Sequence, residues 1–231
     1  MTEKEKILAR VREALTLPAP PPGQPHSHQH PALPINLRFR NPTPSRWLPD
    51  VGATFESRLA LFAKNAADLK AEFHFVDSRD ESLKILLSLR DTEGWKKVGS
   101  HSGELADPVC EALGLPICRT DRAYEVHELE SCDAGISECD ALVAQTGSVL
   151  VTGRSAGGRA LSVLPPHHVV LARKQQLIAD LPEAFALLKR KYAGNYPSFI
   201  SLITGPSRTG DIERILVLGA HGPKKLTILC F

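Results

Sequence analysis

The sequence predicts an α/β fold built on parallel strands, because helical and strand patterns alternate along the first half of its globular region. Apolar residues recur on one helical face over Phe55 to Ala71 and again over Asp80 to Leu89. A short apolar strand follows each helix, at Phe73 to Val76 and at Lys97 to Ser100, and a short helix is expected at Pro108 to Leu113. Alternation at this spacing is typical of parallel strand pairing.

The second half has a different character, with apolar strands separated by turns rich in glycine and proline. No internal repeat is present. The expected elements are an apolar stretch from Ala134 to Ala144, a strand at Val149 to Thr152, strands at Ala160 to Leu164 and His167 to Leu171 with a break at Pro165-Pro166, a helix at Pro182 to Tyr192, a buried strand at Ser198 to Ile203, a helix at Ile212 to Leu218 and a last strand at Leu226 to Cys230.

Size and composition are those of an ordinary globular protein. The chain has 231 residues, of which 42% are hydrophobic and 23% charged, so it can bury one sizeable core. A formal net charge of +2 creates no field that favours nucleic acid. No apolar run is long enough to span a bilayer, and the charged N-terminus lacks the apolar core of a signal peptide. We therefore expect a cytoplasmic protein with no membrane span and no nucleic-acid partner.

The cysteines predict free thiols and not a metal cluster. None of the five forms a C-x-x-C pair, and no spacing matches an iron–sulfur or structural zinc site. No metal and no cofactor is expected. A catalytic thiol is the less favoured alternative, since buried inert cysteine is common.

Three regions are expected along the chain. Residues 1–17 predict a short amphipathic helix, with Thr2 and Glu5 placed as in a capping box. Residues 18–50 are rich in proline and predict an extended spacer, and residues 51–231 form the globular domain. The spacer carries an alternating His26, His28 and His30 tract, but a flexible linker does not preorganise these rings for a metal.

The most informative turn lies between the expected strand that ends at Ile203 and the expected helix that begins at Ile212. A strand-to-helix turn exposes backbone N–H groups at the positive end of a helix, where anions bind well, and an arginine there adds a forked donor. The alternative is a plain helix cap, with Arg208 paired to Asp211 or Glu213. The candidate ligand-binding residues of this turn are Thr204, Gly205, Pro206, Ser207, Arg208, Thr209 and Asp211.

Two other turns, Gln145 to Ser148 and Gly219 to Pro223, carry glycine together with polar side chains. Ligands of open α/β sheets bind at the carboxyl ends of the strands, so we expect the three turns to line one crevice there. His221 is the candidate acid–base group, because histidine changes protonation near neutral pH. Turn capping and loop shaping are the structural alternatives for these side chains. The remaining candidate ligand-binding residues are Thr146, Gly147, Ser148, His168 and Gly222.

The loop from Gly153 to Arg159 is also rich in glycine. Its spacing matches neither the Walker nor the dinucleotide fingerprint, so it does not predict a nucleotide site.

Taken together, these motifs resemble the lactate utilisation protein C family, whose core is the LUD domain. The resemblance covers nearly the whole chain and is most specific in the Ile-Thr-Gly-Pro-Ser-Arg-Thr-x-Asp-Ile-Glu string followed by His-Gly-Pro. Gln145 departs from the family, where glutamate is frequent, and this puts a catalytic acid at that position in doubt. The matching segments are Lys4 to Val11, Ala144 to Val149, Leu164 to Val169, Ile203 to Glu213 and Gly219 to Pro223.

The resemblance implies a Rossmann-like, mostly parallel sheet with an antiparallel addition, similar to the CoA-transferase and ribose-5-phosphate-isomerase group. It also implies a part in the oxidation of L-lactate to pyruvate, alongside partner proteins that carry iron–sulfur clusters. Our interpretation is a component of that system which binds a small anionic ligand in the crevice. Two alternatives are a non-catalytic assembly protein for the iron–sulfur partners, and an enzyme acting on CoA thioesters or sugar phosphates by analogy of fold.

Overall fold

The computed structural model describes residues 5, 8, 9, 12, 48–209, 217–219 and 221–231. The chain divides into two compact units, Met1–Pro42 and Thr43–Phe231. In the first unit the described residues Glu5, Leu8, Ala9 and Arg12 are helical. The His26–His30 tract lies outside the described residues.

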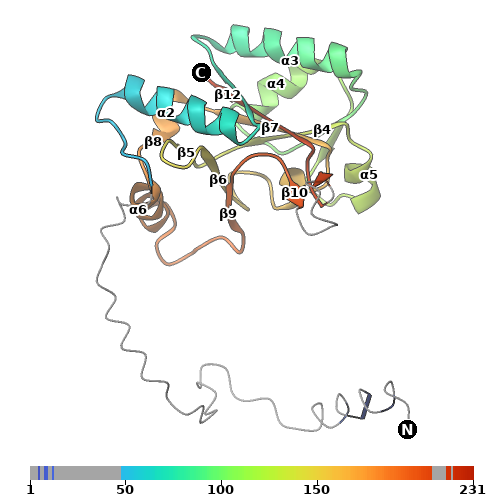
Figure 1. Cartoon of the computed structure of the whole chain (residues 1–231). Helices are drawn as coiled ribbons and strands as arrows, with labels where there is room; N and C mark the ends of the chain where they lie inside the picture. The colour runs from blue at the N-terminus through green and yellow to red at the C-terminus, as the bar shows by residue number, and fades with distance from the viewer. Residues whose placement is uncertain (1–4, 6–7, 10–11, 13–47, 210–216, 220) are drawn as a thin grey trace. The chain divides into compact units, whose positions relative to one another are not determined.

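A six-stranded sheet forms the centre of the second unit, with the strand order β1-β12-β7-β4-β2-β3 (Figure 1). Every pairing in it is parallel, which confirms the predicted parallel core. Its strands are β1 (Glu72–Phe75), β2 (Val98–Ser100), β3 (Ile117–Arg119), β4 (Ala134–Glu138), β7 (His167–Ala172) and β12 (Lys225–Cys230).

A second sheet of four strands has the order β8-β5-β6-β9. Its β5–β6 and β6–β9 pairings are antiparallel and its β5–β8 pairing is parallel, so the antiparallel addition takes the form of a mixed sheet. The strands are β5 (Ala141–Val143), β6 (Ser148–Thr152), β8 (Leu177–Ile178) and β9 (Ile200–Ile203); a separate antiparallel pair joins β10 (Arg208–Thr209) to β11 (Val217–Leu218).

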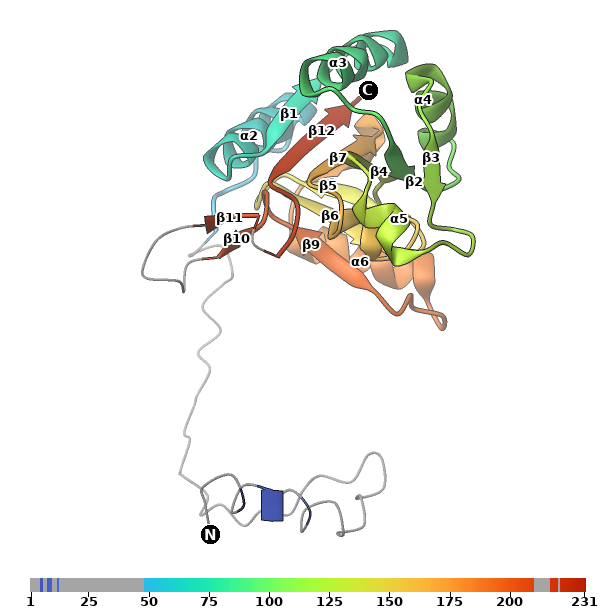
Figure 2. The ribbon, with the colours of Figure 1, turned by 90° about the vertical axis from the view of Figure 1, so that its right-hand side faces the viewer.

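Helices cover the outer faces of the two sheets (Figure 2). One core lies between the six-stranded sheet and the helices α3 and α4, and a second lies between the two sheets, where α2 also packs. A third core lies between the four-stranded sheet and α6. The helices are α2 (Phe55–Asp68), α3 (Arg79–Glu93), α4 (Ala106–Leu113), α5 (Val126–Glu130) and α6 (Leu181–Tyr192), with short 3-10 turns η2 (Ala160–Ser162) and η3 (Lys174–Gln176).

Local sequence sets the ends of these helices. The side chains of Thr54, Ser78 and Asp180 accept hydrogen bonds from backbone N–H groups at the starts of α2, α3 and α6. Helices α3 and α4 end at Gly94 and Gly114, both in the left-handed conformation that glycine adopts without steric cost.

Two predicted elements of the second half are contradicted wholly or in part, and the predicted burial of a third is wrong. The segment Ala160–Leu164 is not a strand, because its backbone closes on itself: the N–H groups of Val163 and Leu164 both donate to the Ala160 carbonyl. The Pro165-Pro166 pair that follows lacks N–H donors and could not extend a ladder. The predicted helix at 212–218 is contradicted at its end, where Val217–Leu218 is strand, and residues 210–216 lie outside the described residues.

The third error is the predicted burial of the strand at 198–203. Strand β9 lies at the edge of its sheet and pairs only with β6 among the described strands. Ile203 packs into the core between the sheets. Ile200 and Leu202 pair with Thr152 and Leu150, on the face of the sheet that α6 covers. Helix α6 leaves this part of the face partly uncovered, so both side chains are exposed.

The five cysteines are free and buried. Burial raises the thiol pKa at every one of them, to about 12 for Cys132 and about 11 for Cys230. A thiol with a raised pKa is a poor nucleophile at neutral pH, so the structure agrees with structural thiols.

Gly147 offers a test of the contact between the 145–148 turn and α2. It has φ of +64°, and a Cβ atom there would lie 2.7 Å from the Cβ of Asn65 and 2.9 Å from its carbonyl carbon. We expect Gly147→Ala to lower the free energy of unfolding by about 2–4 kcal/mol, through backbone strain and overpacking together. Gly114→Ala is the control, because Gly114 has φ of +64° but no atom within 4 Å of the added carbon, so we expect about 1 kcal/mol. Equal losses in urea unfolding would contradict the tight contact.

Candidate functional site

Two of the three predicted turns lie side by side, joined by backbone hydrogen bonds. The N–H of Ser207 donates to the carbonyl of Pro223 over 2.9 Å, and the N–H of Gly219 donates to the carbonyl of Ser207 over 2.8 Å. Gly222 permits this approach, since a Cβ atom there would lie 3.0 Å from the Cβ of Ser207. The turn from Ile203 and the turn before β12 therefore form one wall of a pocket.

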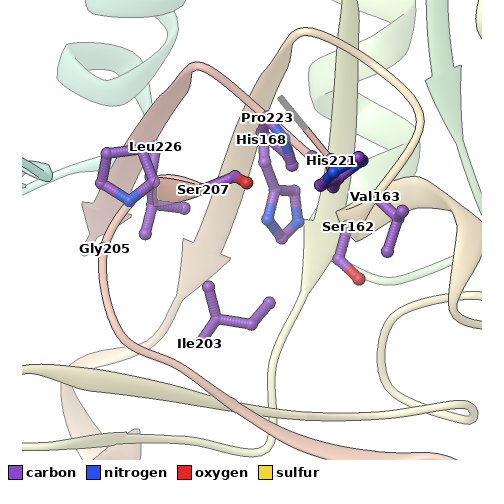
Figure 3. Close-up of a pocket in the computed structure, with 11 residues that line it drawn as sticks. Ser162, Val163, His168, Ile203, Gly205, Ser207, His221, Pro223 and Leu226 are labelled. Atoms are coloured by element: carbon purple, nitrogen blue, oxygen red, sulfur yellow. The ribbon is translucent and has the colours of Figure 1, made fainter. Parts of the chain in front are cut away.

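A cavity of about 150 Å³ lies behind this wall (Figure 3). Its lining mixes apolar side chains with hydroxyl and imidazole groups, as small-molecule sites do. The view shows the His168 ring between Ser207 and Ser162. The lining residues are Ser162, Val163, His168, Ile203, Gly205, Pro206, Ser207, His221, Gly222, Pro223 and Leu226.

His168 is the buried polar group of this cavity. Only 1% of it is exposed, and its Nε2 pairs with the Ser137 hydroxyl over 2.8 Å. Its Nδ1 is buried and has no hydrogen-bond partner within the part of the chain that the structure describes. Burial, together with the neighbouring His167, lowers the pKa of His168 to about 3. The ring is therefore neutral at physiological pH, and Nδ1 either donates or accepts one hydrogen bond, as Ser137 dictates.

The adjacent histidine has a different, structural environment. Successive residues of a strand face opposite sides of the sheet, so His167 faces α3 while His168 faces the cavity. His167 pairs through Nδ1 with Glu93 over 2.9 Å and through Nε2 with Thr227 over 2.9 Å. Although burial opposes it, hydrogen bonds from Lys225, His167 and Trp95 lower the pKa of Glu93 to about 2. Glu93 thus stays ionised and holds the ends of β7 and β12 to α3.

A wider outer hollow of about 610 Å³ shares Val163, His221 and Gly222 with the inner cavity. Its lining includes one lysine, Lys224, and one acid, Glu130. His221 is exposed and lines both hollows, so it stands where they meet. Among the described residues that line the two hollows, Lys224 is the one lysine, and there is no arginine.

The third predicted turn lies beside the pocket and does not line it. Gly147 packs against α2, where the Asn65 side-chain amide donates to the carbonyls of Ala144 and Gln145. Ser148 is buried and its hydroxyl pairs with the Thr204 hydroxyl over 2.8 Å. The Thr146 hydroxyl is buried and has no hydrogen-bond partner among the residues described. This turn therefore supports the 204–207 loop from behind.

Arg208 points away from the inner cavity. Its guanidinium donates to the carbonyl of Leu69 over 2.7 Å, at the C-terminal end of α2. The backbone of Arg208 and Thr209 forms β10, so these two residues do not begin a helix, and the expected helix start at Ile212 lies outside the described residues. Asp211 lies outside the described residues.

The predicted location at the carboxyl ends of the strands is also wrong. His168 and Leu226 are the second residues of β7 and β12, so the pocket lies at the amino edge of the six-stranded sheet. The reason is connectivity, since the Gly219–Pro223 turn precedes β12. Ser162, Val163 and Lys224 were not singled out as site residues from the sequence. Ser162 and Val163 lie in a segment predicted as strand. For Lys224, the one available signal was its position next to the His-Gly-Pro string.

Within the described part of the chain, no group of three or more histidine, cysteine, aspartate or glutamate side chains is arranged to hold a metal ion. In the same residues, no helix combines the length and the apolar character that crossing a bilayer requires.

Comparison with known families now identifies the chain. The LUD domain family matches residues 59–230, so the protein belongs to that family. Proteins named lactate utilization protein C are similar: those of Shouchella clausii and Geobacillus kaustophilus are 34% and 36% identical over 46% and 42% of this chain, and over 46% and 41% of their own. The matches thus span less than half the length of these relatives.

A solved structure supports the fold. A DUF162 family protein from Deinococcus radiodurans superposes with a TM-score of 0.59 at 18% sequence identity, covering 78% of this chain and 99% of its own. At this identity the similarity establishes the α/β architecture alone.

His168 predicts a pH dependence of stability. Its pKa is about 3 in the folded protein, while an unfolded histidine titrates near about 6.5. The unfolded chain therefore binds more protons below that value, and stability is lost as the pH falls from about 6.5 towards 3, by up to about 1.4 kcal/mol per pH unit.

We expect His168→Asn to flatten this slope between about pH 6.5 and 5 in urea unfolding series. Asn195→Ala is the control, since it changes an exposed residue that carries no titratable group, and it should keep the wild-type slope. A slope in His168→Asn as steep as that of the wild type would contradict the buried neutral ring.

Proposed function

We propose that this protein is a component of L-lactate utilisation that binds a small anionic ligand in the pocket beside His168. The observation that carries the proposal is the buried Nδ1 of His168, which has no partner among the described residues and lies in the lining of a cavity. A buried polar atom without a partner costs about 1–3 kcal/mol, and a bound ligand would satisfy it. Membership of the LUD family and the similarity to proteins named lactate utilization protein C supply the biological context.

The size of the cavity favours a ligand of few atoms. Its volume is about 150 Å³, close to the roughly 150 Å³ engineered cavity that accepts benzene, a molecule of six carbon atoms. Lactate and pyruvate have the same number of non-hydrogen atoms. The mixed lining suits such a molecule, since Ile203, Leu226 and Val163 would contact its methyl group while the polar groups contact its oxygens.

The polar groups divide into an inner and an outer set. The neutral His168 ring and the Ser207 hydroxyl would bind the hydroxyl or keto oxygen by uncharged hydrogen bonds. His221 and Lys224, at the opening, would attract and hold the carboxylate. If a proton moves during the reaction, His221 is the side chain that would carry it, because the lowered pKa of His168 prevents that ring from holding a proton at neutral pH.

We further propose that partner proteins carry out the electron transfer. The five cysteines of the chain are buried with raised pKa values, so they are poor ligands for an iron–sulfur cluster. An iron–sulfur partner would therefore supply the redox centre, and both proteins would work in the cytoplasm. We also propose that the fold is related to that of CoA transferases and ribose-5-phosphate isomerase. This proposal rests on the combination of a parallel sheet with a mixed second sheet.

Ligand titration tests the pocket. We expect L-lactate or pyruvate to bind the purified full chain in isothermal titration calorimetry, and His221→Ala to weaken binding about tenfold through loss of one charge-assisted contact. Lys189→Ala removes an exposed cationic side chain of α6 that lines neither hollow, and should leave the affinity unchanged. Wild-type affinity in His221→Ala, or no binding of either acid to the wild type, would overturn the assignment.

The second candidate function is assembly of the iron–sulfur partners without catalysis. One observation favours it: the edge strand β9 exposes Ile200 and Leu202, and Tyr196 just before it is also exposed. Such an edge can accept an additional strand or an apolar surface from another protein. Residues 1–17 and the 18–50 spacer would add a tether outside the globular domain at 51–231.

A deletion separates the two functions. If the protein is a scaffold, removing the residues before Val51 should abolish co-purification of the iron–sulfur partners while L-lactate binding, measured by calorimetry, stays at the wild-type affinity. A matched variant, Leu202→Lys, places a charge on the β9 edge without touching the pocket. Undiminished co-purification with both changes would rule out the scaffold and favour the ligand-binding function.

A further inference from the structure

A second hollow, of about 340 Å³, shares no lining residue with the candidate pocket. It lies between the glycine-rich loop that follows β6 and the segment that precedes β9. Two arginines of the loop, Arg154 and Arg159, line it together with Tyr196 and Ser198 of the segment. The loop is the glycine-rich motif whose spacing fits no nucleotide fingerprint, and the lactate pocket makes no use of it.

The loop is held in one conformation by its own hydrogen bonds. The Thr152 hydroxyl accepts the N–H groups of Arg154 and Ser155 over 3.3 and 3.2 Å. The N–H of Gly158 donates to the carbonyl of Gly153 over 2.8 Å, and the N–H of Gly153 donates to Phe199 of the facing segment over 2.9 Å. Both arginines are therefore presented from a fixed backbone on one side of the hollow.

The two guanidinium groups have no ion-pair partner among the described residues, and no described acid lines the hollow. Arg154 lies 5.6 Å from the ring centroid of Tyr192, a cation–π contact that orients it and leaves its charge uncompensated. Asp140 shares Tyr192 with Arg154, but its Oδ1 already pairs with Lys191 over 2.6 Å and with the Tyr192 hydroxyl over 2.7 Å. Its charge is thus offset by Lys191.

Two like charges beside one hollow repel each other, and the repulsion is relieved when an anion sits between them. Guanidinium groups present planar pairs of N–H donors that match the oxygens of phosphate and carboxylate groups. The Ser198 hydroxyl adds a neutral donor from the opposite side. The exposed Tyr196 ring gives the hollow one apolar rim.

We propose that this hollow is a second ligand site, which binds a dianionic group through Arg154 and Arg159. Its ligand chemistry is that of a phosphoryl group or a dicarboxylate, more highly charged than the monoanion of the lactate pocket. The site is independent of the proposed lactate function, because the lining residues of the two hollows differ.

The test uses inorganic pyrophosphate and malonate as probes on the full-length chain at low ionic strength, with the arginine Nε–Hε signals followed by NMR. We expect the signals of Arg154 and Arg159 to shift saturably, while the signal of Arg190, an exposed arginine of α6 outside the hollow, stays in place. Tighter binding of pyrophosphate would identify a phosphoryl ligand and tighter binding of malonate a dicarboxylate.

Variants complete the experiment. Arg159→Ala, which disturbs no contact with Tyr192, should weaken binding of the tighter probe about tenfold or more, whereas Arg190→Ala removes the same charge and should have no effect. Arg154→Lys keeps the charge but loses the fork, and should also weaken binding. Equal, unsaturable shifts of all exposed arginines, or equal affinities of Arg159→Ala and Arg190→Ala, would show that only general charge screening occurs and would overturn the proposal.

Discussion

The two-residue period of β7 is the constraint on which the candidate site depends. This strand is central in the six-stranded sheet and pairs with both β4 and β12. Because neighbouring side chains of a strand face opposite sides, two adjacent histidines enter unlike environments. His167 pairs with Glu93 and Thr227, and His168 faces the other side with one ring nitrogen that no described residue pairs with. A slip of one residue in the register would exchange their roles.

The buried polar groups near the site differ in whether the protein itself supplies all their hydrogen-bond partners. Glu93 accepts hydrogen bonds from Trp95, His167 and Lys225, and this network fixes α3 against the amino ends of two strands. Among the described residues His168 pairs only with the Ser137 hydroxyl, and its ring remains neutral because burial lowers its pKa. A saturated network stabilises the fold, whereas an incomplete one next to a cavity leaves a hydrogen bond for a ligand to make.

The convergence of the two turns has an equally local cause. Backbone hydrogen bonds join the Ser207 turn to Gly219 and Pro223, and the lack of a side chain at Gly222 lets them approach. Arg208 also helps to position this loop, because its guanidinium binds the carbonyl of Leu69 and so ties the loop to the end of α2. Residues that have the chemistry of ligand binding can thus serve a structural purpose, and geometry alone distinguishes the two uses.

The sequence by itself determined four of the helices (α2, α3, α4 and α6), most of the strands, the parallel core and the family, because these follow from apolar periodicity, capping residues and local motifs over short stretches. It also determined that the 204–207 and 219–223 turns carry polar groups beside glycine. Only the tertiary structure decided that the 145–148 turn supports the pocket from behind, that Arg208 turns towards α2, and that the pocket opens at the amino edge of the sheet. These outcomes depend on which strands become neighbours and on which face each side chain falls. Pairing between segments far apart in the chain leaves no periodic signal in either segment, so no local pattern could reveal it.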